Sequence, residues 1–549
     1  MARSWTKTDL FAAYVGIALL TWATSLETQT TTNLTVYATS SFKAHSLIST
    51  VLVVQGVVLA VVKPPMSKIA DVFGRFEAFS LAVAIYVVGY IMQASASHMS
   101  TYAVAQIFYS AGQTGLQILV QIFIADTSDL LNRALVVTLP DVPFLVTVWM
   151  GPTLADVMLR RLNWRWGYGI WAILLPVAYL PVAVALFTAQ KRAAQRGLLY
   201  GISAKSSSRW QAAMNIWWGM DVVGLLLICV GCSLVLIPLT VNRETGWSHP
   251  SLLTMFVLGA ACLVGFPFWE SNKKLAPQAF FPSTLLRNRT VLAGLAFAFF
   301  YFGAFYLSVY PYFQSYLLVV HHMSVAGAGR VVQTFTLSAT ISSIVASMAI
   351  KHTKRYRRFV TAGTILYLAG IASMFFLRTE RSSLVTIVVS QCLMGIGGGL
   401  AHGPAQLGVQ ASARHQEVAA ATTAFLTFLE IGGAVGSAIS GAIWSNNLPR
   451  SLQHYLPAET KAQATAIYGS VKLAAQGWPR GSPTQVAISH AYQDTIRQIL
   501  LVSMCLCVPC VLLSMIMVDH KLDQIHQVRG VVIGNSHNDT DDSLLNDDE

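Results

Sequence analysis

The sequence has little charge for its length. Only 11% of its 549 residues are Asp, Glu, Lys or Arg, whereas 54% are hydrophobic and the mean hydropathy is +0.56. Because soluble domains carry about 25% charged residues, this composition excludes an ordinary soluble protein. The formal net charge of +12 comes from basic residues spread between apolar runs, and they form no basic patch of the kind that binds nucleic acid. We therefore expect no nucleic-acid partner.

Motifs for catalysis and for metal binding are missing. The sequence contains no phosphate-binding loop, no nucleophile elbow and no zinc-binding His-Glu pattern, which argues against an enzyme and against a nucleotide-driven pump. Only seven cysteines are present. All of them lie in apolar runs, including the three in "CLCVPC", whereas zinc needs four convergent ligands in a polar pocket. We therefore expect no bound metal, no cofactor and no disulfide framework.

Long apolar runs dominate the sequence instead. A run of about 20 residues crosses the hydrocarbon core of a bilayer as a helix. The sequence predicts fourteen such spans, namely 10–35, 46–62, 77–96, 101–124, 138–157, 168–188, 217–240, 251–269, 291–317, 326–350, 360–377, 384–408, 418–443 and 497–518. The chain is thus expected to be an all-α integral membrane protein whose partner is the lipid bilayer.

The basic residues indicate how these spans are oriented. Lys and Arg stay on the cytoplasmic side of short loops. With the N-terminus in the cytosol, most of them fall in inner segments, including the basic stretches 191–209 and 351–359. Fourteen spans then return the C-terminus to the cytosol as well.

The spans divide into two groups of six, an arrangement typical of secondary transporters. We expect a six-helix bundle in residues 1–190 and a second in 290–519, with two linker helices and cytosolic loops in 191–289. The outer segment 445–495 is too long for a simple connection and is a candidate extracellular lid. Residues 520–549 are polar and end in "NDTDDSLLNDDE", which predicts a disordered acidic cytosolic tail.

Charge gathers in one short loop, "SKIADVFGRFEAF" at 67–79. Asp71 precedes a helix start, Gly74 permits close backbone approach, and Arg75 can bind a neighbouring carboxylate. Asp126 is the candidate partner, because its span ends on the same face of the membrane. The sequence predicts a cytoplasmic gate built from Asp71, Gly74, Arg75 and Asp126. A solvated loop that only follows the charge rule is the alternative.

Polar side chains recur along one face of the span 101–124. They are Tyr102, Gln106, Tyr109, Gln113, Gln117 and Gln121, at intervals of three and four residues. Amides facing lipid would be costly, so we expect this face to point inward and Ile118 to face lipid. The stripe, with Gln406 and Gln410 in the glycine-rich span 384–408, is a candidate substrate-binding surface. Hydrogen bonding between helices is the alternative.

Glu27 is the only carboxylate within the first span. An ionisable group at that depth is costly and so a functional candidate, and burial favours the protonated form of a carboxyl. We expect Glu27 to couple protons to transport, with Arg330 as a possible counter-charge and substrate contact. A static ion pair, or a place near the lipid headgroups, is the alternative. Gly151 and Pro152 could kink the span 138–157.

Several segments resemble a known family. Asp71, Gly74 and Arg75 resemble the loop motif of the major facilitator superfamily, with departures at Ser67 and Val72 and also at Phe76. The wider segments are similar to the fungal siderophore–iron transporter family, among them "AQIFYSAGQTGLQIL", "FIADTSDLLNRAL", "LPDVPFLVTVWMGP" and "GIGGGLAHGPAQLGVQAS".

This resemblance implies a major facilitator fold and uptake of intact ferric siderophores in symport with protons. It further implies a monomeric carrier in the plasma membrane, with endosomal vesicles as another location. The Gly-Pro pair at 151–152 is shared with drug:proton antiporters, so a fourteen-span exporter is an alternative. A non-transporting nutrient receptor is a second alternative.

Overall fold

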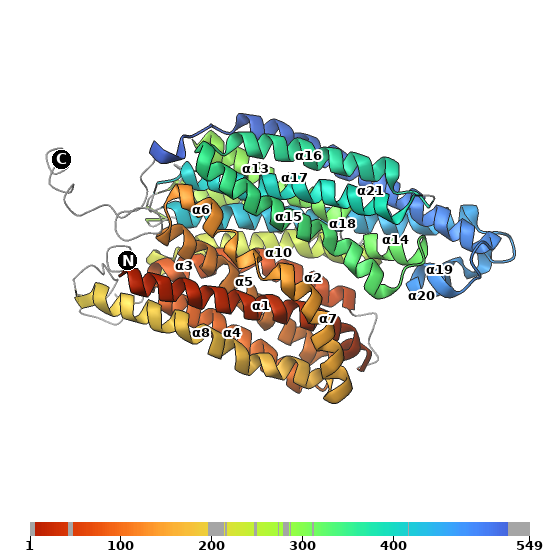
Figure 1. The fold of residues 1–549 in the computed structure, drawn as a ribbon, viewed down its shortest axis with the longest axis horizontal. Helices are drawn as coiled ribbons and strands as arrows, with labels where there is room; N and C mark the ends of the chain where they lie inside the picture. Colours follow the sequence, from red (N-terminus) through yellow and green to blue (C-terminus); the bar gives the residue numbers. More distant parts are fainter. Residues whose placement is uncertain are drawn as a thin grey trace.

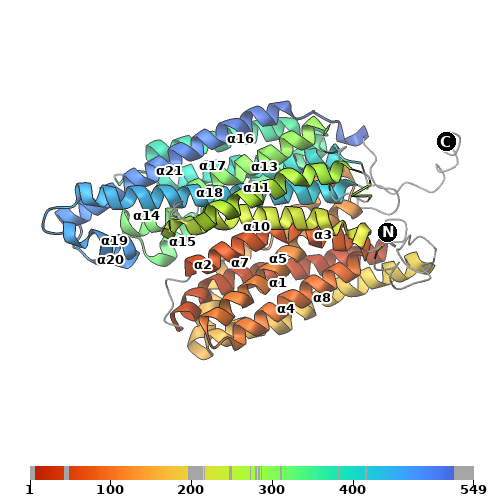
Figure 2. The ribbon, with the colours of Figure 1, turned by 180° about the vertical axis from the view of Figure 1, so that it is seen from behind.

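The computed structural model describes residues 6–41, 48–195, 214, 217–245, 250–272, 274–277, 281, 285, 287–309, 312–380, 382–414 and 417–524. Regular secondary structure in these ranges is helical throughout, and they contain no β-strand. The long helices run side by side along one axis (Figure 1, Figure 2). The expected all-α fold is confirmed.

Six spans of the N-terminal half lie in the described ranges. They are formed by α1 (Lys7–Ser41), α2 (Ile48–Val61) continued by α3 (Lys63–Val72), α4 (Arg75–Ser95), α5 (Met99–Thr127), α7 (Phe144–Arg161) and α8 (Trp164–Gln195). The short helices α6 (Leu130–Val136) and η3 (Leu139–Asp141) join α5 to α7.

The described part of the C-terminal half also contains six spans. Its helices are α13 (Arg289–Ser308) with α14 (Phe313–Val319), α15 (Val325–Thr353), α16 (Arg357–Leu377), α17 (Leu384–Ala411), α18 (Val418–Tyr455) and α21 (Pro483–Ile516). The short helices η5 (Lys461–Gln463), α19 (Ala464–Gly469), α20 (Val471–Gln476) and η6 (Leu522–Gln524) complete it.

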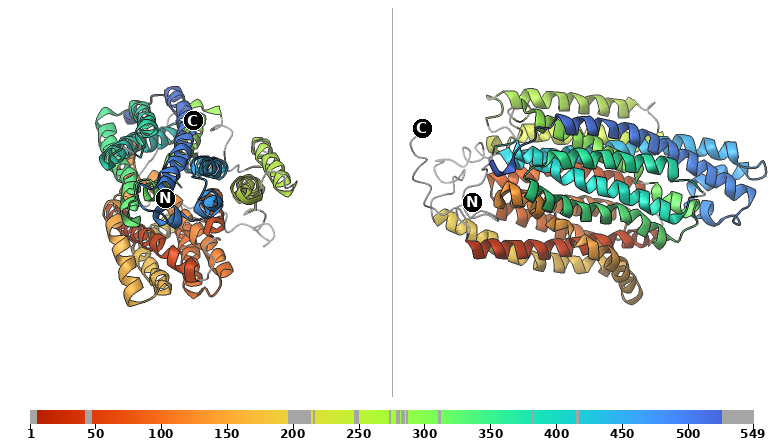
Figure 3. Two further views of the ribbon diagram at one scale, coloured as in Figure 1. Left: turned by 90° about the vertical axis from the view of Figure 1, so that its right-hand side faces the viewer. Right: turned by 45° about the horizontal axis from the view of Figure 1, so that its top comes forward.

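Two further helices, α10 (Val222–Thr245) and α11 (Pro250–Ser271), link the halves. The first packs against α2 of one half and α18 of the other, and the second packs against the first. Figure 3 shows this pair, in yellow-green, at one side of the two bundles. The linker pair therefore covers a seam where the two halves meet.

Thirteen helices among the described residues are long and apolar enough to cross a membrane. The expected span 46–62 is not among them, because α2 is only 14 residues long and two prolines follow it at the start of α3. Pro64 and Pro65 lack amide hydrogens, so the carbonyls of Ala60 and Val61 lose their helical donors. The thiol of Cys229, on α10, donates to the Val61 carbonyl at 3.4 Å and replaces one of these donors.

Side-chain caps fix where several helices begin. An oxygen of the capping side chain accepts a hydrogen bond from a backbone amide in the first turn, which satisfies a donor that has no partner within the helix. The capping residues are Asp129 for α6, Asn288 for α13, Ser324 for α15, Ser383 for α17, Ser470 for α20 and Ser482 for α21.

Glycines set the closest helix crossings. A Cβ on Gly112 of α5 would lie 2.4 Å from the Tyr86 Cα of α4, and one on Gly397 of α17 would lie 2.2 Å from the Tyr367 amide of α16. Only glycine permits this approach. The glycine-rich segment of α17 therefore serves close crossing, and the helix continues without a break to Ala411.

The outer segment of the C-terminal half differs from the expected loop 445–495. Helix α18 extends to Tyr455 and α21 begins at Pro483, so the connection is only 456–482. Its helices α19 and α20 pack against α18, α14 and α21, all of the same half. The described contacts therefore make this segment a cap on the C-terminal half.

We call the end of the molecule where α1 begins and α21 ends the inner end (Figure 1). Most contacts between the halves join elements at this end: α6 with α15, α17 and η6, and α3 and α5 with α18. The residues 520–524 are ordered there, since the Leu522 amide donates to the Lys354 carbonyl at 3.1 Å. The remainder of the expected acidic tail, 525–549, lies outside the described residues.

Candidate functional site

The loop between α3 and α4 depends on Gly74. This residue is the N-cap of α4 and has a φ of 118° and a ψ of 164°, a backbone conformation that residues other than glycine rarely adopt. A Cβ at Gly74 would also meet the Glu77 carboxylate at 2.5 Å. The turn lets α4 start directly at Arg75 and brings its side chain against the end of α3.

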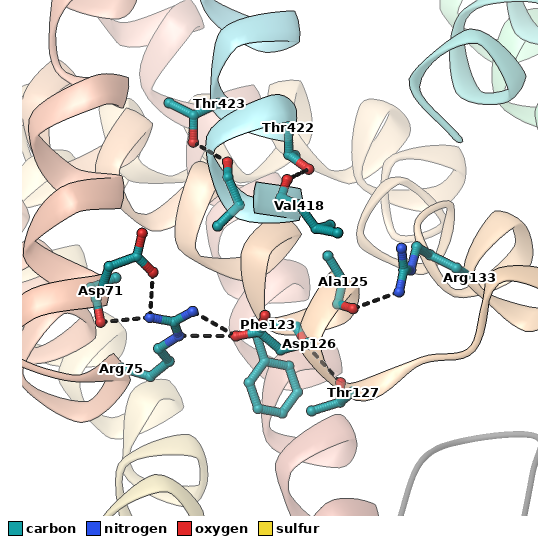
Figure 4. Close-up of polar contacts among 12 residues, drawn as sticks. Asp71, Arg75, Phe123, Ala125, Asp126, Thr127, Arg133, Val418, Thr422 and Thr423 are labelled. Atoms are coloured by element: carbon teal, nitrogen blue, oxygen red, sulfur yellow. Dashed lines mark hydrogen bonds and ion pairs between the residues drawn. The ribbon is translucent and has the colours of Figure 1, made fainter. Parts of the chain in front are cut away.

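Arg75 joins three helix ends at the inner end of the N-terminal half. Its Nε and Nη2 atoms each lie 2.9 Å from the Asp126 Oδ2 atom, in α5. Its Nη1 atom donates to the Asp71 Oδ1 atom at 2.8 Å and to the Ala70 carbonyl at 2.6 Å (Figure 4). The expected contact between Arg75 and Asp126 is present. A gating role for it remains a proposal.

Helix α6 connects this cluster to the C-terminal half. Arg133 is fully buried and donates through Nη2 to the Ala125 carbonyl at 2.8 Å (Figure 4). The same atom donates to the Ser128 carbonyl at 2.9 Å. It thereby satisfies carbonyls at the end of α5. From the other half, the Ser347 hydroxyl donates to the Ala134 carbonyl at 2.7 Å. The end that holds Asp126 is thus joined to α15 through α6.

The matching loop of the C-terminal half is built differently. Lys354 has a left-handed φ of 58°, and its ammonium group lies 2.9 Å from the Asp523 carboxylate. Arg355 lies 2.6 Å from Asp519. The hydrogen bond from Lys354 lowers the pKa of Asp523. This loop therefore pairs with residues that follow α21, whereas the loop of the first half pairs with α5.

Glu27 is buried in the middle of α1, with 1% of its surface exposed. Its Oε2 atom accepts from the Tyr86 hydroxyl at 2.8 Å and from the Thr28 hydroxyl at 3.2 Å. Its Oε1 atom accepts from the Thr31 hydroxyl at 2.8 Å. None of the ion pairs among the described residues involves Glu27, and Arg330 is exposed on α15. The structure therefore surrounds this carboxyl with hydroxyls and not with the expected counter-charge.

Three tyrosines pack beside this carboxyl. The rings of Tyr86 and Tyr90 stack at 4.9 Å between centroids, and the Tyr109 ring meets them edge-on at 5.4 and 5.6 Å. The Gln113 amide donates to the Thr28 hydroxyl at 3.1 Å. Tyr109 and Gln113 of the expected polar stripe thus belong to the surroundings of Glu27.

The outer part of the stripe serves packing within the N-terminal half. The Tyr102 and Tyr168 hydroxyls lie 3.0 Å apart, and the Gln106 amide donates to the Tyr102 hydroxyl at 3.0 Å. Tyr102 and Gln106 are both buried. These contacts favour the alternative reading, helix-to-helix hydrogen bonding, for this part of the stripe.

The inner part of the stripe turns toward the C-terminal half. The Gln406 amide of α17 donates to the Gln121 side-chain carbonyl of α5 at 3.3 Å, so these two residues bridge the halves. Gln117 shares this helical face and is exposed. Gln410 instead donates to the Thr422 hydroxyl at 2.9 Å within its own half. The expectation that Ile118 faces lipid is wrong, because neighbouring helices bury it completely.

Gly151 lies where α7 crosses α1. A Cβ at this position would stand 2.4 Å from the Gln29 Cβ, so glycine permits close packing of the two helices. Helix α7 continues through Gly151 and Pro152 to Arg161. A kink at this pair stays a prediction.

One buried ion pair was not predicted from the sequence. The Lys63 Nζ atom lies 2.6 Å from the Glu430 Oε1 atom, and the two side chains are 1% and 15% exposed. Lys63 follows directly after the expected span 46–62, so the sequence predicts an ordinary lysine at the end of a membrane span. Glu430 lies within the expected span 418–443, where an ionisable residue is itself a functional signal.

Comparisons with known proteins agree with this arrangement. The sequence profile described as Major Facilitator Superfamily matches residues 13–271 and 269–437. The chain is 52% identical over 526 residues to "MFS siderochrome iron transporter C" of Aspergillus fumigatus, which covers 95% of this chain and 86% of that protein. It is 34% identical over 514 residues to "Siderophore iron transporter 2" of Schizosaccharomyces pombe, covering 92% and 85%.

Solved structures share the fold at low sequence identity. An auto-inhibited POT family peptide transporter superposes with a TM-score of 0.54 at 15% identity, covering 92% of this chain and 98% of that one. A bacterial homologue of the human lysosomal transporter Spinster, inward-facing and occupied, gives a TM-score of 0.53 at 13% identity and covers 95% and 98%. Identities this low show the likeness of the fold alone.

Proposed function

The chain belongs to the siderophore iron transporters of the major facilitator superfamily, and we propose that it imports intact ferric siderophores together with protons. It is a carrier and not an enzyme. The names of relatives that match over 85 and 86% of their length support the substrate class. The lack of a nucleotide-binding motif in the sequence supports an ionic driving force.

The surroundings of Glu27 carry the proton part of the proposal. This carboxyl accepts hydrogen bonds from three hydroxyls and has no ion-pair partner among the described residues. Burial makes the free energy of its charged form less favourable than that of its protonated form. Its proton occupancy can therefore follow the access of water as the carrier alternates between its two orientations. At about 100 mV each co-transported proton supplies about 2.3 kcal/mol, equivalent to about a fiftyfold gradient.

The substrate surface is proposed at the stripe of α5 that faces the C-terminal half. In a ferric siderophore the iron already has an oxygen shell, so the carrier needs no metal ligands of its own. Amides and aromatic rings suffice to hold such a polar chelate. Gln117 is exposed on this face and Gln113 borders the surroundings of Glu27. Arg330, exposed on α15, is a further contact in this proposal.

The inner-end cluster is proposed to latch one orientation of the carrier. Arg75 holds α3, α4 and α5 together, and α6 joins that end of α5 to the other half. Rocking of one half against the other is the general motion of such carriers. A latch at the inner end would keep that side closed while substrate enters from the other.

We further propose that the carrier acts as a monomer in the plasma membrane with its inner end in the cytosol. The basic loop 351–359 and the start of α1 both lie at that end, as the distribution of positive charge requires for cytosolic segments. Import from the medium then runs from the outer end toward the inner end.

The test is uptake of radioactive iron supplied as preformed siderophores. The full-length chain is expressed in a fungal strain without its own siderophore uptake, and a panel of hydroxamate siderophores is offered at acid and neutral pH. We expect accumulation of at least one siderophore, stimulated by acid and abolished by a protonophore. Efflux of preloaded compounds without any uptake would contradict import and favour the drug:proton exporter.

A further inference from the structure

The Lys63–Glu430 pair lies in the seam between the two halves. Lys63 opens α3 in the N-terminal half, and Glu430 lies in the first half of α18 in the C-terminal half. The two helices pack against each other. The pair is the buried ion pair that joins the halves among the described residues, since the other pairs lie within one half.

The burial of the two partners is unequal. Lys63 is almost completely buried, whereas the Glu430 side chain keeps 15% of its surface exposed. Removing charges from water is costly, and a buried charge that loses its partner is strongly unfavourable. Separation of α3 from α18 therefore requires a new partner for Lys63 and either water or a proton for Glu430, which is the more accessible of the two.

His402 of α17 is the candidate for such a partner. Its ring stacks on Tyr301 at 5.8 Å and meets Phe425 at 5.7 Å, so its position is fixed by aromatic packing. The charge of Lys63 acts on this ring. The Nε2 atom is buried and has no hydrogen-bond partner among the described residues. In the tautomer protonated at Nδ1, Nε2 is a free acceptor.

Apolar side chains and a small set of titratable groups surround the pair. An apolar cluster formed by α2, α10 and α18 adjoins the pair on the α10 side. The titratable groups that the described contacts bring to this region are Lys63 of α3, His402 of α17, Tyr301 of α13, Cys229 and Cys232 of α10, and Cys507 and Cys510 of α21. Further along α3, the charges of Asp71, Asp221 and Glu270 act on Lys68.

We propose that Glu430 is a second proton-carrying residue, whose deprotonated form locks the two halves through Lys63. A proton that arrives from water binds the Glu430 carboxylate, and the Lys63 ammonium then turns its N–H donor to the His402 Nε2 atom. Loss of the ion pair frees α3 from α18 and lets the inner end open. Loss of the proton restores the lock. This site is separate from Glu27, which lies wholly within the N-terminal half.

The test measures opening directly and needs no substrate. Spin labels are attached to cysteines introduced at Lys191 and His352, both exposed at the inner end in opposite halves, with the exposed Cys505 replaced by Ser. The distance between the labels is followed from pH 5 to 8 in full-length protein in lipid nanodiscs. A lock released by one proton changes the ratio of open to closed forms by up to about tenfold per pH unit.

We expect Glu430→Gln to stay open at every pH, because it imitates the protonated form. The His402→Phe variant keeps an aromatic ring at this position but removes the acceptor, so the pH at which the inner end opens should be lower. The double swap Lys63→Glu with Glu430→Lys should restore the closed form at neutral pH. In Asp156→Asn, which removes an exposed carboxylate at the outer end, the response should equal that of the unsubstituted protein.

Two results would overturn the proposal. If Glu430→Gln closes and opens with pH as the unsubstituted protein does, Glu430 does not carry the proton. If it stays closed at all pH values, the ion pair is not the lock. Because no siderophore is present, failure of this proposal is distinguishable from failure of the proposed import. A carrier of some other substrate would still show the pH-dependent opening.

Discussion

Arg75 and Asp126 are 51 residues apart in the sequence, yet the Arg75 Nε atom lies 2.9 Å from the Asp126 Oδ2 atom. Their side chains are 18% and 31% exposed. A fully solvated pair would contribute little, but these groups are partly shielded and Arg75 also binds the Asp71 carboxylate and the Ala70 carbonyl. The pair therefore fixes how α4 and α5 meet at the inner end.

Reversing either charge of this pair should impair transport. Hydrogen bonds to charged groups are worth about 1.5–3 kcal/mol, so Arg75→Glu or Asp126→Arg is expected to lower siderophore uptake by about tenfold or more. The double swap should recover part of this loss. It is best made with Asp71→Asn, because otherwise the new carboxylate at position 75 would face Asp71.

The exposed pair of Asp156 and Arg160 supplies the matched control. Both side chains are more than half exposed, so the same double swap there should leave uptake unchanged. If the swap of Arg75 and Asp126 recovers nothing while protein levels are normal, the contact is not the latch that we propose.

Neutralising Glu27 should uncouple transport from protons. Glu27→Gln keeps the size and hydrogen-bonding capacity of the side chain but cannot exchange a proton. We expect siderophore binding and exchange across the membrane to persist, with loss of the accumulation that one proton supports, about fiftyfold at 100 mV. The measurement is uptake against equilibrium exchange in proteoliposomes with an imposed proton gradient.

The shorter carboxylate of Glu27→Asp keeps the titratable group and should retain acid-stimulated accumulation. Asp156→Asn serves as the control for loss of a carboxylate elsewhere in the same half. A Glu27→Gln carrier that still concentrates siderophore with normal dependence on pH would show that Glu27 does not couple protons.

Removing the Gln117 amide should weaken siderophore binding. This side chain is exposed on the face of α5 that turns toward the C-terminal half. Loss of one hydrogen bond to a ligand corresponds to about a 2- to 10-fold rise in Kd, so we expect that change for Gln117→Leu. Gln113→Leu should act in the same direction and should also disturb the surroundings of Glu27, because Gln113 donates to Thr28.

Gln106→Leu is the control on the same helix. Gln106 is buried and donates to Tyr102, so its loss should lower thermal stability without changing Kd. Equal changes of Kd at positions 106, 113 and 117 would indicate that the whole stripe acts in helix packing alone.

The outer cap of the C-terminal half should loosen in acid. Burial lowers the pKa values of His321 and His322, and the charge of Arg480 lowers that of His322 further. The folded form therefore binds fewer protons than the unfolded form below about pH 6.5, the usual histidine pKa, and stability in this region falls as pH falls. Protonation of His322 also removes an acceptor beside the Gln485 amide, 2.7 Å away.

Hydrogen exchange in the segments 313–323 and 471–485 is expected to be faster at pH 5 than at pH 7.5, after correction for intrinsic rates. His322→Asn should reduce this difference, and Asn suits the left-handed φ of 50° at this position. His454→Asn, on the same exposed outer face, should not. An identical pH response in the His322 variant would assign the effect to another group.

Much of the fold could be predicted from the sequence. An apolar run long enough to span a bilayer must satisfy its backbone hydrogen bonds within itself, and a helix does so. The loop at 67–79 was predictable for a similar reason. Gly74 demands a special backbone conformation, and the alternation of spans brings the start of α4 and the end of α5 to one face. Arg75 and Asp126 therefore had few other partners within reach.

The tertiary structure alone decided how the polar residues are shared among helices. The stripe of α5 has one helical face in the sequence, but in the fold it divides into Tyr102 and Gln106 within the N-terminal half, Gln113 beside Glu27, and Gln121 against the other half. The contact of Lys63 with Glu430, 367 residues away, was equally hidden. Hydropathy fixes that a segment crosses the membrane, but it does not fix the rotation of each helix about its axis or its neighbours, because these depend on side-chain packing between segments distant in the chain.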